Sequence, residues 1–127
     1  MKSPGGSMFP YYYKGGEIHC LKYGSKYDNE ESLFKLMEQE QEFIFNINRK
    51  LKIWVDFYET TITDRVLQEF INHLQRINDR IDKISIVGLT GFNLWRIKRK
   101  IKKSGINLII SFYKDPEDAK TWLIHDK

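Results

Sequence analysis

Two hydrophobic patterns alternate along this chain. Three short segments are almost continuously apolar, which is typical of buried β-strands; they are Leu51 to Phe57, Lys83 to Leu89 and Ile106 to Tyr113. Between them, apolar residues recur every three or four positions, as on one face of an amphipathic helix. The clearest such stripe consists of Val66, Leu67, Phe70, Ile71, Leu74, Ile77 and Ile81. We therefore expect strands and helices to alternate over this region.

Residues at the expected helix ends support this alternation. Thr63 and Asp115 suit N-caps, Pro116 suits a first helical position, and Gly105 suits a helix stop. An earlier helix is expected over residues 28–47, capped by Asp28 or Asn29. Its apolar positions are Leu33, Leu36, Met37, Phe43, Ile44 and Ile47. The last part of this segment, FIFNI, also suits a short strand, and we favour the helix.

The N-terminal region predicts a β-hairpin. Residues 9–24 read as two short strands around Gly15 and Gly16, because paired glycines allow the positive φ angles of a tight turn. Residues 1–8 have no clear pattern, and we expect a flexible tail or residues of non-native origin. Strands joined by short helical connections run parallel. We predict one α/β domain, residues 9–127, with a mixed sheet of four or five strands and the hairpin as its antiparallel edge.

Charge is distributed unevenly over the 127 residues. The net charge is +4, but six of the eight residues 96–103 are basic, and Asp28 to Glu42 holds six carboxylates against Lys35 alone. Such a dipolar chain argues against a dedicated nucleic-acid binder, which spreads basic residues over a wide face. The single cysteine, Cys20, is expected to be a small core residue in a reducing, cytoplasmic protein. We expect no metal, no cofactor and no membrane span.

The basic segment, residues 94–104, predicts an amphipathic helix. Leu94, Ile97 and Ile101 fall on one face, with Trp95 near its edge. We expect Trp95 to belong to the core, and an interfacial anchor is the alternative. The remaining positions are mostly basic: Arg96, Lys98, Arg99, Lys100, Lys102 and Lys103. Cations late in a helix complement its dipole, but the dipole does not account for the absence of acids. The surplus favours a negatively charged protein surface as partner, then an anionic lipid surface, and nucleic acid last.

Three stretches carry a resemblance to a known family. LKIWVDF is followed by a threonine-rich loop and DRVLQEFINHL; KISIVGLTGFNLWRIKRKIKKSGI is a strand, turn and helix; SFYKDPEDAKTWL is a closing strand and helix. In this order, over residues 16–124, they resemble the STAS domain of bacterial anti-sigma-factor antagonists, and most closely its SpoIIAA-like (STAS/SEC14-like) relatives. The resemblance implies a non-enzymatic regulatory module that binds a protein partner.

The resemblance also implies a site in the loop after the central strand. In the family, an Asp-Ser-Ser-Gly motif in this loop carries a serine that a partner kinase phosphorylates. Here the loop reads YETTITD, without serine or glycine, so the phosphoserine switch is not carried over. The resemblance places the partner on the adjacent helix as far as Gln68 and on this loop, or at the edge near Thr90. The loop residues are Tyr58, Glu59, Thr60, Thr61 and Thr63. The alternative interpretation is a cap at Thr63 with two solvent-facing threonines beside it.

Other candidate chemistry is weak. Thr90 and Gly91 follow a strand and could accept an anion or ligand, although a tight turn explains them better. We interpret Glu38, Glu40 and Glu42 as a solvated acidic face, and His19, His73 and His125 as non-catalytic. We therefore expect no enzyme. The alternative functions are a carrier of a small apolar ligand or lipid, or binding of an anionic surface through residues 94–104.

Overall fold

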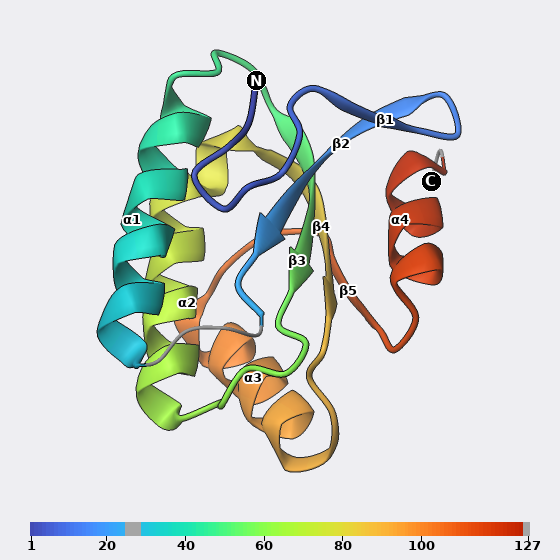
Figure 1. Ribbon diagram of the computed structural model, residues 1–127. Coiled ribbons are helices and arrows are strands. Elements are labelled where there is room, and N and C mark those ends of the chain that lie inside the picture. The colour runs from blue at the N-terminus through green and yellow to red at the C-terminus, as the bar shows by residue number, and fades with distance from the viewer. Residues whose placement is uncertain (25–28, 126–127) are drawn as a thin grey trace.

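Strands and helices alternate along the chain as the apolar pattern predicts (Figure 1). The structure is a computed structural model and describes residues 1–24 and 29–125. Its strands are β1 (Tyr11–Tyr13), β2 (Gly16–Lys22), β3 (Leu51–Asp56), β4 (Ile81–Val87) and β5 (Ile110–Tyr113). Its helices are α1 (Glu30–Phe45), α2 (Asp64–Ile77), α3 (Gly91–Ser104) and α4 (Pro116–Ile124), with a 3-10 turn η1 (Asn78–Arg80) before β4.

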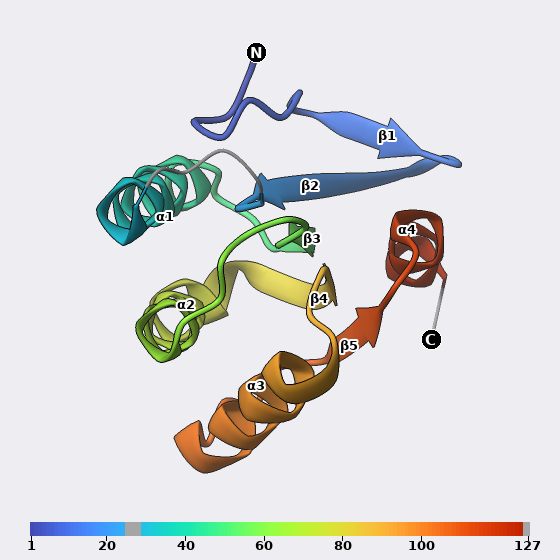
Figure 2. The same ribbon diagram turned by 60° about the horizontal axis from the view of Figure 1, so that its bottom comes forward.

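The five strands form one mixed sheet in the order β1-β2-β3-β4-β5. β1 pairs with β2 antiparallel, and the pairs β2–β3, β3–β4 and β4–β5 are parallel. Helices α1, α2 and α3 lie on one face of the sheet and α4 lies on the other (Figure 2). The predicted fold class, a single α/β domain with a mixed sheet and an antiparallel N-terminal edge, is confirmed.

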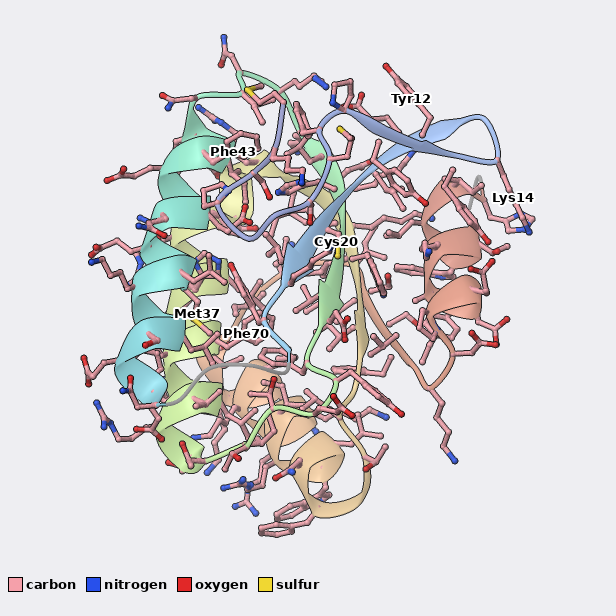
Figure 3. The ribbon with its side chains drawn as sticks, in the orientation of Figure 1. Tyr12, Lys14, Cys20, Met37, Phe43 and Phe70 are labelled. Atoms are coloured by element: carbon pink, nitrogen blue, oxygen red, sulfur yellow. The ribbon has the colours of Figure 1, made fainter. Side chains whose placement is uncertain are left out.

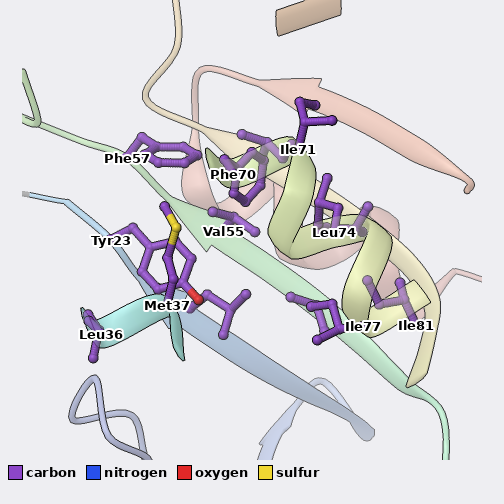
Figure 4. Close-up of a cluster of buried hydrophobic side chains, with 14 of the residues drawn as sticks. Tyr23, Leu36, Met37, Val55, Phe57, Phe70, Ile71, Leu74, Ile77 and Ile81 are labelled. Carbon is purple, nitrogen blue, oxygen red and sulfur yellow. The ribbon is translucent and has the colours of Figure 1, made fainter. Parts of the chain in front are cut away.

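The main core lies between the sheet and helices α1 and α2. Side chains at alternate positions of β3 are fully or almost fully buried there, and α2 buries the predicted stripe from Val66 to Ile77 against them. Ile81, the last position of the predicted stripe, instead begins β4 and is buried there. At the carboxyl end of the strands, the rings of Tyr23, Phe57 and Phe70 pack together (Figure 4). Phe57 and Phe70 meet edge to face with ring centroids 4.9 Å apart. Aromatic rings therefore fill this end of the core.

The helix-end predictions hold for every cap that the structure describes. Asn29, Thr63 and Asp115 each accept a backbone hydrogen bond at the start of α1, α2 and α4, respectively. Gly105 ends α3 in the left-handed conformation, with φ of 75°. The segment FIFNI is helical through Phe45, as favoured. Asp28, the other candidate cap of α1, lies outside the described residues.

The hairpin turn differs by one residue from the prediction. Lys14 and Gly15 occupy the two positive-φ positions, with φ of 48° and 88°, whereas Gly16 already belongs to β2 and pairs with Tyr13. Gly16 is needed for another reason. A Cβ atom there would lie 2.6 Å from Cγ2 of Ile124, so the absence of a side chain lets α4 approach the hairpin.

Residues 1–8 pack against the domain, in contrast to the flexible tail that we expected. They form a loop closed by a bridge between Lys2 and Met8. Ser3 and Ser7 are buried, and the Ser7 hydroxyl donates a hydrogen bond of 2.7 Å to the Cys20 carbonyl oxygen. The loop therefore connects to β2 (Figure 3 marks Cys20 on this strand). The segment has few apolar residues, so hydropathy does not reveal that polar contacts hold it.

Glu40 corrects the prediction of a solvated acidic face. Its side chain is fully buried in α1, on the stripe of Leu36, Met37 and Ile44, while Glu38 and Glu42 are exposed. Glu40 Oε1 lies 3.1 Å from His19 Nε2, and Glu40 Oε2 accepts hydrogen bonds from the Ser3 hydroxyl and the Gly5 N–H. A buried carboxyl group with several donors is satisfied, so it can occupy a core position.

Strand β5 is half-buried, although the sequence predicted a fully buried strand over residues 106–113. It covers Ile110–Tyr113 and pairs with β4 alone, so it forms the edge of the sheet. Ile109, just before it, is exposed. The apolar run reflects partial cover, because Leu108, Ile110 and Phe112 pack only partly buried against the core and α4 contacts the strand from the other face. Among the described residues, no helix has the length and apolar character needed to cross a membrane.

Candidate functional site

Helix α3 docks by its apolar stripe and turns its basic residues outward, as predicted. Ile97 is buried, and Leu94 and Ile101 pack partly buried against the core. Trp95 is a correction, because its side chain is 53% exposed rather than part of the core. It stacks on Phe92, which is 68% exposed, with ring centroids 5.7 Å apart. An exposed aromatic pair next to basic residues is a feature of binding surfaces.

A groove of about 450 Å³ runs between α2 and α3. Helix α3 contributes the basic wall and Trp95, and α2 contributes Asp64, Gln68 and Ile71. Four of the predicted basic residues line it: Arg96, Arg99, Lys100 and Lys103. The other two, Lys98 and Lys102, are exposed on the same helix but do not line the groove. The structure thus brings most of the predicted basic surface to one concave feature.

The basic residues of the groove fall into an inner and an outer pair. In the inner pair, Lys100 Nζ lies 3.2 Å and Arg96 Nη1 lies 3.8 Å from Asp64 Oδ1. In the outer pair, Arg99 and Lys103 have no acidic partner among the described residues. The Arg99 guanidinium lies 5.3 Å from the centroid of the Trp95 ring. Asp64 therefore neutralises part of the inner charge, and the rim stays positive.

The predicted partner loop, Tyr58 to Thr63, leads directly into this groove. The Ile62 carbonyl oxygen accepts a hydrogen bond of 3.4 Å from Arg96 Nη2, so the loop also contacts α3. Tyr58 is 63% exposed, and Glu59 and Thr61 are exposed beside it. These three side chains face solvent and are accessible to a partner.

The other two threonines of the loop have structural contacts. The Thr60 hydroxyl donates a hydrogen bond of 2.7 Å to the Tyr23 carbonyl oxygen. The Thr63 hydroxyl donates to the Glu30 carboxylate and accepts from the Val66 N–H, which ties the start of α2 to the start of α1. Thr63 is thus a cap, whereas Thr60 is not the solvent-facing side chain that the alternative interpretation expected.

Thr90 and Gly91 form the turn at the start of α3. The Thr90 carbonyl oxygen accepts hydrogen bonds from the backbone N–H groups of Asn93 and Leu94. Its side chain makes no capping hydrogen bond, and both residues are exposed. Their arrangement matches the tight turn that explained the sequence best.

Gly88 holds the turn before α3 against the partner loop. Its φ is 94°, and a Cβ atom there would lie 2.5 Å from the backbone nitrogen of Tyr58. Both the conformation and the contact exclude a side chain. We expect Gly88→Ala to lower the free energy of unfolding by at least about 2 kcal/mol, measured by urea denaturation.

Gly105→Ala is the matched control for this substitution. Gly105 also has a positive φ, of 75°, but nothing lies within 4 Å of the position that a Cβ atom would take there. We expect it to cost about 1 kcal/mol, through backbone conformation alone. Equal losses for the two variants would contradict a close backbone contact at Gly88.

The buried network around Glu40 does not pair the Ser3 hydroxyl with the His19 imidazole as nucleophile and base. Ser3 and His19 each contact Glu40, so the carboxyl group lies between them. Burial raises the pKa of the Cys20 thiol to about 12, which keeps it protonated and a poor nucleophile at neutral pH. Among the described residues, no group of three or more His, Cys, Asp or Glu side chains is placed to hold a metal ion.

The resemblance placed partner contact on Tyr58 to Gln68, but sequence reasoning did not foresee that this part of α2 forms a groove with α3. Asp64 and Gln68 are ordinary polar positions of an amphipathic helix, and only the packing of α2 on α3 brings them to the basic residues.

Comparison with known proteins finds no matching family model, no matching curated protein and no matching solved structure. The candidate site is therefore the α2–α3 groove with the adjoining loop Tyr58 to Thr63, defined by its own geometry.

Proposed function

We propose that this protein is a non-enzymatic, STAS-like regulatory module that binds an acidic protein partner in the α2–α3 groove. The observation that carries the proposal is the positive rim of a concave surface. Arg99 and Lys103 have no acidic partner among the described residues, and Trp95 lies beside them with half of its surface exposed. An aromatic anchor with unpaired cations suits a partner that presents acidic side chains around an apolar one.

The loop Tyr58 to Thr63 extends this surface. It follows the central strand, which is where the resemblance to STAS domains implies partner contact, and Tyr58 offers a second exposed ring. The partner is expected to cover Tyr58, Gln68 and the rim of the groove together. The carrier alternative receives less support, since Tyr23, Phe57 and Phe70 pack into one another where a central ligand would lie.

Charge reversal of the rim tests the proposal. We expect Arg99→Glu combined with Lys103→Glu to weaken binding of a fluorescent peptide rich in glutamate and aspartate by at least about tenfold at low salt. Wild-type binding is expected to weaken as salt rises, because the charges are exposed. Fluorescence anisotropy measures both effects.

A matched control has the same change in net charge at a distance from the groove. Lys14→Glu with Lys50→Glu alters two exposed lysines that do not line the groove, and we expect less than a twofold effect. Equal losses in the two double variants would contradict a specific site. Vesicles with anionic lipid and a single-stranded oligonucleotide are tested alongside the peptide. Tighter binding of either probe than of the peptide would contradict an acidic protein as the partner of the groove.

Site-specific cross-linking in the native host tests the partner itself. A benzophenone amino acid at Gln68, inside the groove, is expected to give one discrete protein adduct. The same amino acid at Gln75, exposed on α2 and not lining the groove, is expected to give none. The adduct should disappear in the Arg99→Glu, Lys103→Glu background. Persistence in that background would contradict the proposed surface.

A further inference from the structure

A second groove, of about 440 Å³, lies on the face of the sheet that carries α4. Its lining comes from five elements: the N-terminal loop, β1, β2, β3 and α4. Cys20 and Trp54 alternate with the core-facing residues of their strands and so face this side. Among the described helices, only α4 lies on this face (Figure 2). The groove is therefore separate from the α2–α3 groove and independent of the proposed function.

One wall of this groove is fixed by a buried polar network. Lys2, Gly6, Ser7 and Met8 form the wall, and they belong to the loop that Glu40 holds through Ser3 and Gly5. Gly5 lies so close that a Cβ atom there would be 2.8 Å from Glu40 Oε2. Ser7 is bonded to β2 as well. A loop anchored at two points gives the groove a defined shape rather than a fluctuating one.

The lining combines apolar surface with positive charge. Met8, Tyr11 and Trp54 contribute apolar side chains, and Met8 is largely exposed. Lys2, Lys22 and Lys120 contribute ammonium groups, and no lining residue is acidic. Lys120 Nζ lies 5.1 Å from the centroid of the Trp54 ring. It also lies 3.7 Å from Oε2 of Glu117, a residue that does not line the groove. The charge thus lies directly beside the apolar surface.

We propose that this groove binds a small amphipathic carboxylate. Its hydrocarbon part would lie along Trp54, Tyr11 and Met8, and its carboxylate would meet the lysine ammonium groups. A cationic ligand would face like charge, most directly at Lys2, and a neutral apolar ligand would gain nothing from it. An anion with an apolar body uses both features of the lining, since hydrocarbon burial and charge attraction add together.

Titration with decanoate, observed by two-dimensional NMR of the 15N-labelled protein, tests the proposal. We expect saturable shifts of the Trp54 indole N–H, assigned with Trp54→Phe, and a dissociation constant below about 1 mM. Decanol and decylamine carry the same chain without the negative charge, and we expect each to bind at least fivefold more weakly. Equal affinity for decanol, or tighter binding of decylamine, would overturn the carboxylate assignment. Phenylpropanoate, run alongside, distinguishes an aromatic from an aliphatic body.

Substitutions in the lining of the groove test where decanoate binds. We expect Lys2→Gln, and separately Met8→Glu, to weaken decanoate binding at least fivefold, while Lys14→Gln leaves it unchanged. The positions are exposed, so these variants should fold, which the retained NMR spectrum verifies. The rim variant Arg99→Glu, Lys103→Glu should bind decanoate like the wild type. Loss of binding in that variant, or none in the groove variants, would overturn the proposal without affecting the peptide experiments.

Discussion

Acidification is expected to destabilise the fold through His73, beginning well above the pH at which most carboxylates titrate. The side chain is fully buried in α2, and its Nε2 lies 2.8 Å from the Tyr23 hydroxyl. Burial, and to a smaller extent the charge of Arg76, lowers the pKa of His73 from 6.5 to about 3. The folded protein therefore keeps this imidazole neutral over a range in which the unfolded chain protonates it.

The sign of the effect follows from proton binding. Above pH 6.5 the imidazole is neutral in both states and makes no pH-dependent contribution. Between pH 6.5 and about 3 the unfolded state binds one more proton, so the free energy of unfolding falls as the pH falls. The slope approaches 1.4 kcal/mol per pH unit, and the full window corresponds to roughly 5 kcal/mol. A loss of this size is a large part of the stability of a small domain.

Comparison with His73→Gln isolates this contribution. Glutamine can keep a hydrogen bond to Tyr23 but does not titrate, so the variant retains every other titrating group of the wild type and lacks only His73. Urea denaturation at pH 7.5, 5.5 and 4.5 is expected to show the wild type losing stability faster than the variant over this series. Parallel pH profiles would mean that His73 is protonated in the folded state, contrary to its burial.

The order of the elements could be predicted because burial and local geometry repeat along the sequence. The β3 segment alternates between the two faces of the sheet, and the α2 stripe has an unbroken helical period. Caps such as Thr63 and Asp115 act within three residues, so they too are visible in sequence. The hairpin turn was misplaced by one residue because the contact of Gly16 with Ile124 lies 108 positions away in the chain.

The candidate site was only half visible for the same reason. The basic residues of α3 stand in one run, whereas Asp64, which neutralises two of them, comes from another helix. Trp95 is adjacent to Leu94 and therefore about 100° away around the helix, beyond the apolar stripe, so its exposure could have been inferred. Glu40 carried a signal as well. It is spaced four from Leu36 and four from Ile44, on the buried stripe, although its partners could not be identified from spacing.

Removal of the Glu40 carboxyl group is expected to cost about 3 to 5 kcal/mol of unfolding free energy. Glu40→Ala leaves His19 Nε2, the Ser3 hydroxyl and the Gly5 N–H without their acceptor in a region where Glu40 and His19 are fully buried. It also opens a cavity beside the Phe9 and Phe43 rings, which pack on His19. Urea denaturation measures the loss, and Glu38→Ala, exposed on the same helix, should change stability by less than about 0.5 kcal/mol.

The same substitution separates two roles of this network. If the main role of Glu40 is to hold the N-terminal loop, amide hydrogen exchange in residues 1–9 of Glu40→Ala should accelerate far more than exchange in β3. Decanoate binding should then weaken in the same variant. Replacing both partners with apolar residues, as in His19→Phe with Glu40→Leu, should recover much of the stability, because no unpaired imidazole is left in the core. The loop should stay released in that double variant, since Ser3 and Gly5 still lack an acceptor. A double variant with recovered stability and a protected loop would show that Ser7 and Phe9 suffice to hold it.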